Sequence, residues 1–293
     1  MEIGIIGGGA VGLLMAHYLG KRNKVTLYVR RSEQMELVNE LGVGLGGTSD
    51  TVKVEARLIE DLSHHDLTFV CVKQNHLKGL MPVLEEIGDE ETLVFLQNGM
   101  GHLERIRKLS SAVMVGVTEH GALKTADYSV RHTGKGVIRL ASMEKSSNVD
   151  RLMEQLNQDH FPFIAERDYY HMLAKKLVVN AVINPLTALF EVRNGQLLEN
   201  PFIHDLALGL CREACQVLKL DFAAEWENTE RVARATAANY SSMYKDISAC
   251  RPSEIEAITG YLLAETDTLP IHSFIYQAIK AKEFERRKEG HHG

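Results

Sequence analysis

The sequence is poor in the features that mark secreted, membrane-spanning and metal-binding proteins. Its four cysteines show no CxxC spacing and no paired framework, so we expect buried thiols and a reducing, cytoplasmic location. No run reaches the ~18 apolar residues that a membrane span needs. The thirteen histidines include no HExxH or comparable ligand spacing, and we therefore expect no metal site.

The N-terminus and the charge balance exclude two further classes. The chain opens with Met1 and Glu2 rather than a basic region, and five glycines interrupt its first twelve residues, so this apolar start is not typical of a signal peptide. A net charge of −6 argues against general affinity for nucleic acid. We expect neither nucleic acid nor a membrane as a partner.

What the sequence does contain is a glycine-rich turn between a predicted strand at 2–6 and a predicted helix at 13–19. The turn consists of Gly7, Gly8, Gly9, Ala10, Val11 and Gly12. This is the GxGxxG pattern in its required strand–turn–helix context, which predicts a dinucleotide site. The first glycine permits the tight turn, Gly9 lets a pyrophosphate approach the backbone, and the last allows close helix–strand packing. The phosphates would then lie against unpaired N–H groups at a helix N-terminus.

The end of the next predicted strand, 24–29, favours NADP over NAD. An NAD site usually places an acidic residue there, to accept from the ribose 2′-hydroxyl. Here Arg30 and Arg31 follow the strand, and the nearest acid, Glu33, begins the next helix. Arginine can grip the dianionic 2′-phosphate with paired hydrogen bonds. The alternative interpretation is a solvated basic turn.

Predicted strands and helices alternate up to about residue 167, which indicates a parallel doubly wound sheet of the α/β class. Further strands are expected at 52–57, 67–72, 93–96 and 113–117, and helices at 32–41, 75–87 and 101–109. Extra antiparallel strands within 125–140, a helix at 149–157 and a strand at 161–165 complete this half.

Two strands of this sheet are followed by polar residues. Lys73 and Asn98 follow the strands expected at 67–72 and 93–96, and ligand-binding groups belong at the carboxyl ends of such strands. A surface lysine and a turn-forming asparagine are the alternatives for these two residues.

The remaining sequence is predicted to be helical. Helices are expected at 201–219, 223–239, 253–265 and 271–287, and no linker rich in proline, glycine or serine precedes them. We therefore predict an all-α domain at 168–293 that packs directly on the domain at 1–167 and forms a cleft with it.

The stretch Leu173–Leu189 opens this helical half and combines an apolar surface with a polar row. Lys176, Asn180 and Asn184 recur every four residues, so on a helix they share one face. A buried helix should not carry a lysine and two amides without partners. The row therefore either bonds internally in a core or faces a cleft. Pro185 should kink or end the helix.

Glu254 is a further acidic candidate. It follows Ser253, which is a good N-cap for the helix expected at 253–265. An acid at the first helical position also has a purely electrostatic explanation, because its negative charge is attracted to the positive end of the helix dipole.

Taken together, these stretches resemble the ketopantoate reductase (2-dehydropantoate 2-reductase) family nearly from end to end. The motifs that carry the resemblance are GGGAVG at 7–12, CVKQ at 71–74, QNGMG at 97–101, HGA at 120–122, KLVVNAVINPLTAL at 176–189, NG at 194–195, SSMYKDI at 241–247 and SEIEAITGYLL at 253–263. The resemblance implies an NADP-dependent oxidoreductase that reduces 2-dehydropantoate with NADPH to D-pantoate, in pantothenate and coenzyme A biosynthesis.

The resemblance also implies roles for individual residues. Lys176 would donate a proton to the substrate carbonyl oxygen, with Glu254 near it and near the nicotinamide ribose. The substrate would be held by Asn180, Asn184, Asn194 and Ser242, and the cofactor would be lined by Lys73, Asn98, Ala122 and Glu254. Either Arg30 or Arg31 could meet the 2′-phosphate.

Two alternatives to this function stay open at the level of sequence. One is an NADP-dependent reductase of another 2-keto acid, with a differently shaped acyl pocket. The other is a non-catalytic NADP-sensing protein on the same scaffold, although a sensor would not need Lys176, Glu254 and the asparagines together. The small-molecule 2-keto acid is the expected partner, and an exposed apolar face on a C-terminal helix would indicate a homodimer.

Overall fold

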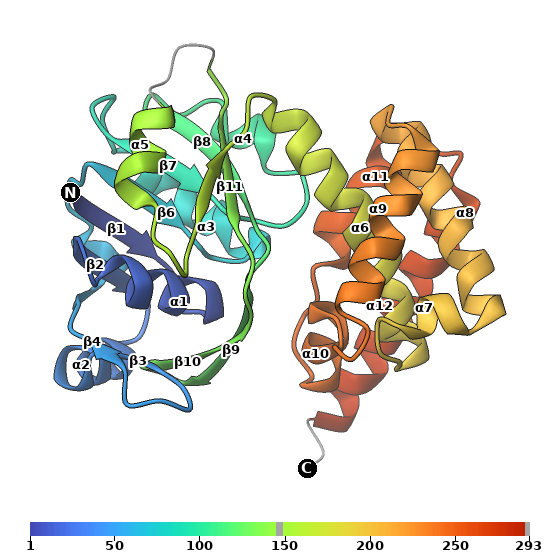
Figure 1. Ribbon diagram of the computed structural model, residues 1–293, viewed down its shortest axis with the longest axis horizontal. Coiled ribbons are helices and arrows are strands. Elements are labelled where there is room, and N and C mark those ends of the chain that lie inside the picture. The colour runs from blue at the N-terminus through green and yellow to red at the C-terminus, as the bar shows by residue number, and fades with distance from the viewer. Residues whose placement is uncertain (145–148, 291–293) are drawn as a thin grey trace. The chain divides into compact units, whose positions relative to one another are not determined.

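The structure, a computed structural model that describes residues 1–144 and 149–290, divides into two units (Figure 1). Unit 1 comprises Met1–Gln97 and His102–Met172, and unit 2 comprises Asn98–Gly101 and Leu173–Gly293. Unit 1 is an α/β unit and unit 2 is helical, as the sequence predicted.

Unit 1 is built on an eight-stranded sheet ordered β12-β11-β8-β7-β6-β1-β2-β5 (Figure 1). Every neighbouring pair is parallel except β8 with β11, so the predicted doubly wound sheet is confirmed. Its strands are β1 (Glu2–Ile6), β2 (Lys24–Val29), β5 (Glu55–Leu58), β6 (Leu67–Val70), β7 (Thr92–Phe95), β8 (Ala112–Thr118), β11 (Ile138–Ser142) and β12 (Phe163–Ala165). Its helical segments are α1 (Ala10–Leu19), α2 (Ser32–Leu41), η1 (Ile59–Asp61), α3 (Gln74–Glu85), α4 (Leu103–Ile106) and α5 (Val149–Leu156).

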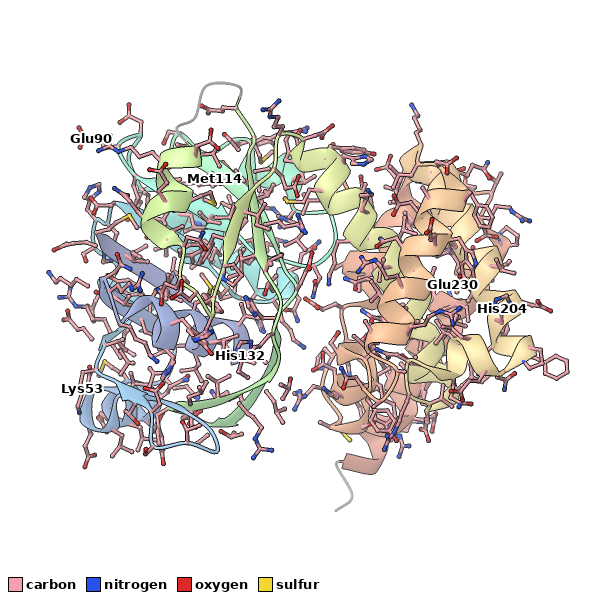
Figure 2. All side chains as sticks on the ribbon, in the orientation of Figure 1. Lys53, Glu90, Met114, His132, His204 and Glu230 are labelled. Carbon is pink, nitrogen blue, oxygen red and sulfur yellow. The ribbon has the colours of Figure 1, made fainter. Side chains whose placement is uncertain are left out.

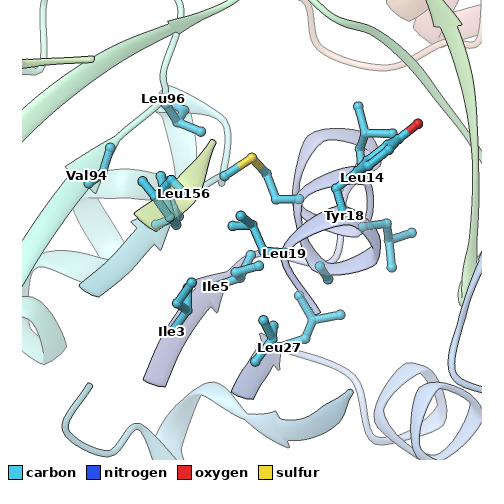
Figure 3. Packing of buried hydrophobic residues seen from close by; sticks show 14 of the residues in the cluster. Ile3, Ile5, Leu14, Tyr18, Leu19, Leu27, Val94, Leu96 and Leu156 are labelled. Atoms are coloured by element: carbon cyan, nitrogen blue, oxygen red, sulfur yellow. The ribbon is translucent and has the colours of Figure 1, made fainter. Parts of the chain in front are cut away.

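The core of unit 1 lies between this sheet and the helices α1 and α5 (Figure 3). Ile3 and Ile5 of β1 and Leu19 of α1 are fully buried there, and Leu156 of α5 completes the contact. All residues of β1 after Glu2 are buried because parallel strands are covered on both faces. This packing holds the end of β1, where the glycine-rich turn begins, in a fixed place.

Unit 1 also carries a four-stranded second sheet, ordered β4-β3-β10-β9, that the sequence analysis predicted only in part. Its strands are β3 (Val43–Leu45), β4 (Thr51–Val52), β9 (Gly121–Ala126) and β10 (Ser129–Gly134). The single strand expected at 52–57 was wrong, because its ends belong to β4 and β5 in different sheets. β3 was missed because three residues are too few to show an alternating pattern. The bulge expected at Gly134 is present, where the register of β9 and β10 shifts.

Unit 2 is a helical assembly that begins within α6, the longest helix in the described part of the chain. Its helices are α6 (Tyr169–Phe190), α7 (Gln196–Glu199), α8 (Pro201–Leu218), α9 (Phe222–Ala235), α10 (Ser242–Ser248), the π-helical η2 (Glu256–Gly260), α11 (Tyr261–Glu265) and α12 (Pro270–Gly290). Side-chain oxygens of Asn200, Asp221 and Ser241 cap α8, α9 and α10 by accepting from backbone N–H groups. These caps set where the helices begin.

The helix α6 runs through Pro185, so of the two expected outcomes, a kink or an end, the helix does not end there. After the proline, the hydroxyl of Thr187 donates to the carbonyl oxygen of Ile183 at 2.7 Å. This hydrogen bond gives a backbone carbonyl near Pro185 a donor. α6 is long and apolar enough to cross a membrane, but 78% of its most apolar window is buried within the fold. That burial is typical of a core helix.

A hydrogen-bonded chain of aromatic side chains links the second sheet to α1. The Gly136 N–H donates to His120 Nδ1 at 3.1 Å, so this nitrogen is an acceptor and the ring carries its proton on Nε2. His132 is labelled in Figure 2, and its Nε2 atom lies 3.0 Å from His120 Nδ1. The Nδ1 atom of His132 lies 2.8 Å from the Tyr18 hydroxyl. The His120 ring is therefore neutral in this arrangement, and burial lowers the pKa of His120 to about 4.

This chain predicts a pH-dependent stability. The unfolded His120 takes up a proton near pH 6.5 while the folded one resists it down to about pH 4. Stability is therefore unaffected above pH 6.5 and is lost as the pH falls from there towards 4. His120→Asn, whose side-chain oxygen can replace the Nδ1 acceptor, should make this fall less steep in urea unfolding measured across the pH range.

His160→Asn is the matched control, because His160 is exposed in the same unit. It should reproduce the wild-type pH dependence. If His120→Asn keeps the wild-type pH dependence, the loss of stability at low pH does not come from His120.

Candidate active site

The glycine-rich turn combines a left-handed glycine, an open position and an uncapped helix N-terminus. Gly7 has a φ of +115° and donates its N–H to the Tyr28 carbonyl at 2.9 Å. A Cβ on Gly12 would lie 1.8 Å from the Gly7 oxygen, whereas a Cβ on Gly9 would meet nothing within 4 Å. No side chain caps the N-terminus of α1, which Gly9 precedes. The space beside Gly9 and the uncapped helix end with Ala10 and Val11 fit an anion.

Basic side chains gather at the carboxyl ends of β2 and β6, on either side of β1 in the sheet. Arg30 follows β2, and Lys73 precedes the first residue of α3. Burial lowers the pKa of His76 in α3, and the charges of Arg30 and Lys73 lower it further, so the three groups lie within electrostatic reach. Their shared location predicts attraction for a dianion.

The two consecutive arginines differ in their surroundings. A nitrogen of Arg31 lies 2.6 Å from the Asp127 carboxylate, in the turn between β9 and β10. Arg30 is exposed and makes no ion pair among the described residues. The structure therefore commits one arginine to the second sheet and leaves the other at the end of β2.

In unit 2 three of the predicted site residues form a hydrogen-bonded row. The Asn98 amide nitrogen donates to Glu254 Oε2 at 2.7 Å, and the Asn98 oxygen accepts from the Asn180 amide at 3.5 Å. Asn180 is only 8% exposed, so a partner is needed there. Lys176 lies one helical turn before Asn180 on α6 and is partly buried. Residues from three distant stretches of sequence thus meet at one place.

The segment that carries Asn98 fits closely against the π-helical turn η2. Gly99 has a φ of +81°, and a Cβ there would lie 2.0 Å from the Ala257 carbonyl oxygen. The helix expected at 253–265 is present from residue 255, and its first part is the π-helical η2 that precedes α11. Ser253 does act as a cap by accepting from the Ile255 N–H at 3.2 Å, while the Glu254 carboxylate is engaged by Asn98.

The other predicted substrate ligands have separate surroundings. Asn194 donates to the Thr236 hydroxyl at 2.8 Å, and its buried side-chain oxygen has no partner among the described residues. Asn184 is buried on α6. Ser242 is exposed at the start of α10, whereas the preceding serine, Ser241, is the buried one and caps that helix.

The last predicted cofactor residue, Ala122, lies in β9 opposite His132 of β10. Three residues near the glycine-rich turn were missed by the sequence analysis: Gln34 and Lys124 donate to the Gly8 carbonyl, and Asp127 accepts from both of these side chains. They had no motif that could have marked them, because they come together only when the second sheet folds against α2.

Comparison with known proteins gives matches along the whole chain. Residues 3–145 match the family described as "Ketopantoate reductase PanE/ApbA", and residues 168–283 match "Ketopantoate reductase PanE/ApbA C terminal". The 2-dehydropantoate 2-reductase of Bacillus subtilis is 39% identical over 97% of this chain and 98% of its own length. That of Listeria innocua is 35% identical over 98% of both.

Solved structures show the same fold. The crystal structure of the probable 2-dehydropantoate 2-reductase from Bacillus subtilis, 39% identical, covers 96% of this chain and 100% of its own with a TM-score of 0.87. The structure of D-mandelate dehydrogenase with NADH and anilino(oxo)acetate is 22% identical, and the match covers 98% of this chain and 99% of that one with a TM-score of 0.90. The dimeric ketopantoate reductase from Staphylococcus aureus is 21% identical and covers 98% and 100%, with a TM-score of 0.79. The last two likenesses show the fold alone.

The tight contact at Gly99 predicts that this glycine cannot be replaced. Gly99→Ala should destabilise the protein by about 2 kcal/mol or more, because a left-handed backbone and a clash with a carbonyl combine. The free energy of unfolding from urea titration checks this. Gly79→Ala is the control, because a Cβ at Gly79 in α3 meets nothing within 4 Å.

The control should be neutral or should stabilise by up to ~1 kcal/mol, as expected for alanine in a helix. Equal stability of the two variants would mean that the Asn98–Gly101 segment is not held against η2.

Proposed function

The chain belongs to the ketopantoate reductase family, and on that premise we propose that it reduces 2-dehydropantoate to D-pantoate with NADPH, in pantothenate and coenzyme A biosynthesis. Membership of the family makes it an oxidoreductase. The names of relatives at 39% and 35% identity support the substrate.

The observation that carries the proposal is the row formed by Asn180, Asn98 and Glu254. A buried amide on an apolar helix could have been satisfied within the core, but Asn180 donates instead to an asparagine that also binds a carboxylate. We place the keto acid beside this row, with Lys176 on the same face of α6. A non-catalytic sensor would have no use for such a row.

Lys176 is proposed as the proton donor. The bound dinucleotide supplies a hydride to the substrate. Hydride addition at C2 of a 2-keto acid turns the carbonyl oxygen into an alkoxide, which needs charge stabilisation and a proton. An ammonium group provides both. We propose that Glu254, held by Asn98, orients this ammonium group by its opposite charge.

The substrate is proposed to bind through neutral groups. Amides such as Asn180, Asn184 and Asn194 can hydrogen-bond its hydroxyl without repelling its own carboxylate, as an acidic residue would. The unpaired buried oxygen of Asn194 supports this use, because a buried acceptor needs a donor. Ser242 is exposed and can donate to the substrate carboxylate.

NADPH is proposed as the reductant because of the basic groups at the ends of β2 and β6. Arg30 and Lys73 are assigned to the 2′-phosphate, and Arg31 is assigned to its ion pair with Asp127. The glycines from Gly7 to Gly12 are assigned to the pyrophosphate. Asn98 and Ala122 remain candidates for further cofactor contacts.

A cytoplasmic homodimer is the proposed working form. Phe274 and Phe284 on α12 are 65% and 60% exposed, which gives that helix the apolar surface that a second copy could cover. The Staphylococcus aureus neighbour is described as dimeric. A reducing cytoplasm is consistent with four cysteines that form no disulfide in the described chain.

One assay tests the proposed function. NADPH oxidation is followed against a panel of 2-keto acids that includes ketopantoate and an aryl 2-keto acid. The proposal expects ketopantoate to have the highest kcat/KM. A higher value for another acid would favour a reductase of different specificity on the same scaffold, and no turnover with any acid would favour a sensor.

The different surroundings of the two arginines predict different effects on cofactor choice. Arg30→Ala should weaken NADPH relative to NADH by about tenfold or more, since it removes a charge-assisted contact with the 2′-phosphate. Arg31→Ala is the matched variant and should leave the NADPH to NADH ratio of kcat/KM within about twofold, well below one such contact. The reverse order would assign the phosphate to Arg31.

The proposed proton donor predicts a loss of rate rather than of binding. Its interaction strengthens as the alkoxide forms, so it contributes to kcat. Lys176→Ala should reduce single-turnover NADPH oxidation by roughly 10²–10⁴-fold, the usual range for a positioned proton donor. Lys176→Arg should recover part of the rate, because it keeps the charge but is a poor proton donor.

NADPH affinity is the control for this pair and should change little, because the glycine-rich turn and Arg30 are in unit 1. If Lys176→Ala transfers hydride at a rate within about threefold of wild type, the loss of rate is far below the expected range. Lys176 would then not be the proton donor.

A further inference from the structure

The carbonyl oxygen of Gly8, in the middle of the glycine-rich turn, accepts hydrogen bonds from two side chains. Gln34 Nε2 of α2 donates at 2.8 Å, and Lys124 Nζ of β9 donates at 3.0 Å. Gln34 is 5% exposed, and its amide lies so close that a Cβ on Gly8 would come within 2.5 Å of it. A side chain at position 8 would collide with Gln34, which explains the glycine there.

An ion cluster holds the lysine in place. Lys124 Nζ lies 2.7 Å from Asp127 Oδ1, and a nitrogen of Arg31 lies 2.6 Å from the same oxygen. The Gln34 amide also donates to the Asp127 backbone carbonyl at 2.8 Å. Two cations share one carboxylate, so the cluster keeps a net positive charge. The lysine and the glutamine are thus both fixed to the β9–β10 turn.

This arrangement fixes the orientation of the peptide that joins Gly8 to Gly9. In a trans peptide the N–H points opposite to the preceding carbonyl oxygen. With the Gly8 oxygen held towards Gln34 and Lys124, the Gly9 N–H is directed away from them. A free glycine peptide would rotate readily. The two bonds therefore hold one donor of the turn before any ligand arrives.

We propose that Lys124 and Gln34 are positioning residues for the cofactor pyrophosphate: by holding the Gly8 carbonyl they orient the Gly9 N–H towards the phosphates. This inference rests on the proposed dinucleotide function of the turn. It also gives the second sheet a function, since β9 delivers the lysine and the β9–β10 turn delivers the carboxylate that fixes it. Preorganisation of this kind raises affinity without a new contact to the ligand.

A purely structural role makes different predictions from a positioning role. If the lysine only ties β9 to the turn, its loss lowers the melting temperature and leaves the affinity of the folded protein unchanged. If it positions the peptide, every ligand with a pyrophosphate loses affinity by the same factor. A ligand that carries the 2′-phosphate without a pyrophosphate does not.

The experiment measures dissociation constants of full-length variants for NADPH, NADH and adenosine 2′-monophosphate by calorimetry. Lys124→Met keeps the apolar stem and removes the donor, and we expect about tenfold weaker binding of NADPH and NADH alike, the effect of losing one charged hydrogen bond. Adenosine 2′-monophosphate should bind within about twofold of wild type, and the KM for the keto acid should be unchanged. Lys124→Arg, which can still donate to the Gly8 oxygen, should recover affinity to within about threefold.

Gln34→Met gives an independent arm, because it deletes the second donor to the same oxygen. The double variant with Lys124→Met should lose less affinity than the product of the two single losses, since both act on one carbonyl. Lys135→Met, at an exposed lysine between β10 and β11, is the control and should match wild type.

If folded Lys124→Met or Gln34→Met binds NADPH with a dissociation constant within about twofold of wild type, the change is too small for one charged hydrogen bond. That result would overturn the inference while the proposed function stands. An equal loss for adenosine 2′-monophosphate would overturn it too, because the effect would then not be specific to the pyrophosphate. A wild-type protein that binds no NADPH would overturn both.

Discussion

The buried amides of α6 impose the constraint on which unit 2 depends. An unpaired buried polar group costs ~1–3 kcal/mol, and α6 is apolar around most of its surface. Asn180 meets the requirement by donating to Asn98, which donates in turn to Glu254. Asn98 of the segment 98–101 and Glu254, which precedes η2, are therefore linked to α6 by these two bonds. Lys176 lies one helical turn before Asn180 on the same helix.

In the proposed function unit 1 has a different requirement, which is to hold negative charge without burying a counter-charge. The groups assigned to it are the backbone N–H groups at the start of α1 and cations at strand ends. Arg31 is paired with Asp127, which also pairs with Lys124, while Arg30 stays exposed at the end of β2. The proposed selectivity for a 2′-phosphate is therefore assigned to Arg30.

Sequence periodicity and motif context were sufficient where a segment determines its own structure. β2 and α2 have the predicted bounds, Lys24–Val29 and Ser32–Leu41, because their apolar patterns and flanking residues are local. The roles expected for the glycines agree with the +115° φ of Gly7 and the open space at Gly9. The polar row on α6 was also visible, because a lysine and two amides stand out on an apolar helix.

The features that sequence reasoning missed all depend on contacts between distant segments. Nothing near Asp127 in the sequence indicates that it pairs with Arg31, 96 residues away. The close fit of Gly99 against Ala257 of η2 joins segments far apart in the sequence, and the three-residue β3 exists only because β4 and β10 pair with it. Such contacts are set by packing, for which local propensity carries no signal.

In the proposed function Lys176 and the row of Asn180, Asn98 and Glu254 serve hydride transfer to the C2 carbon of ketopantoate. The most direct measurement supplies ketopantoate and NADPH that is dideuterated at C4 of the nicotinamide, and analyses the product by mass spectrometry and chiral chromatography. We expect D-pantoate with one deuterium at C2, formed at the rate at which NADPH is consumed. Consumption of NADPH without deuterated pantoate, or deuterium in the L-enantiomer, would contradict this expectation.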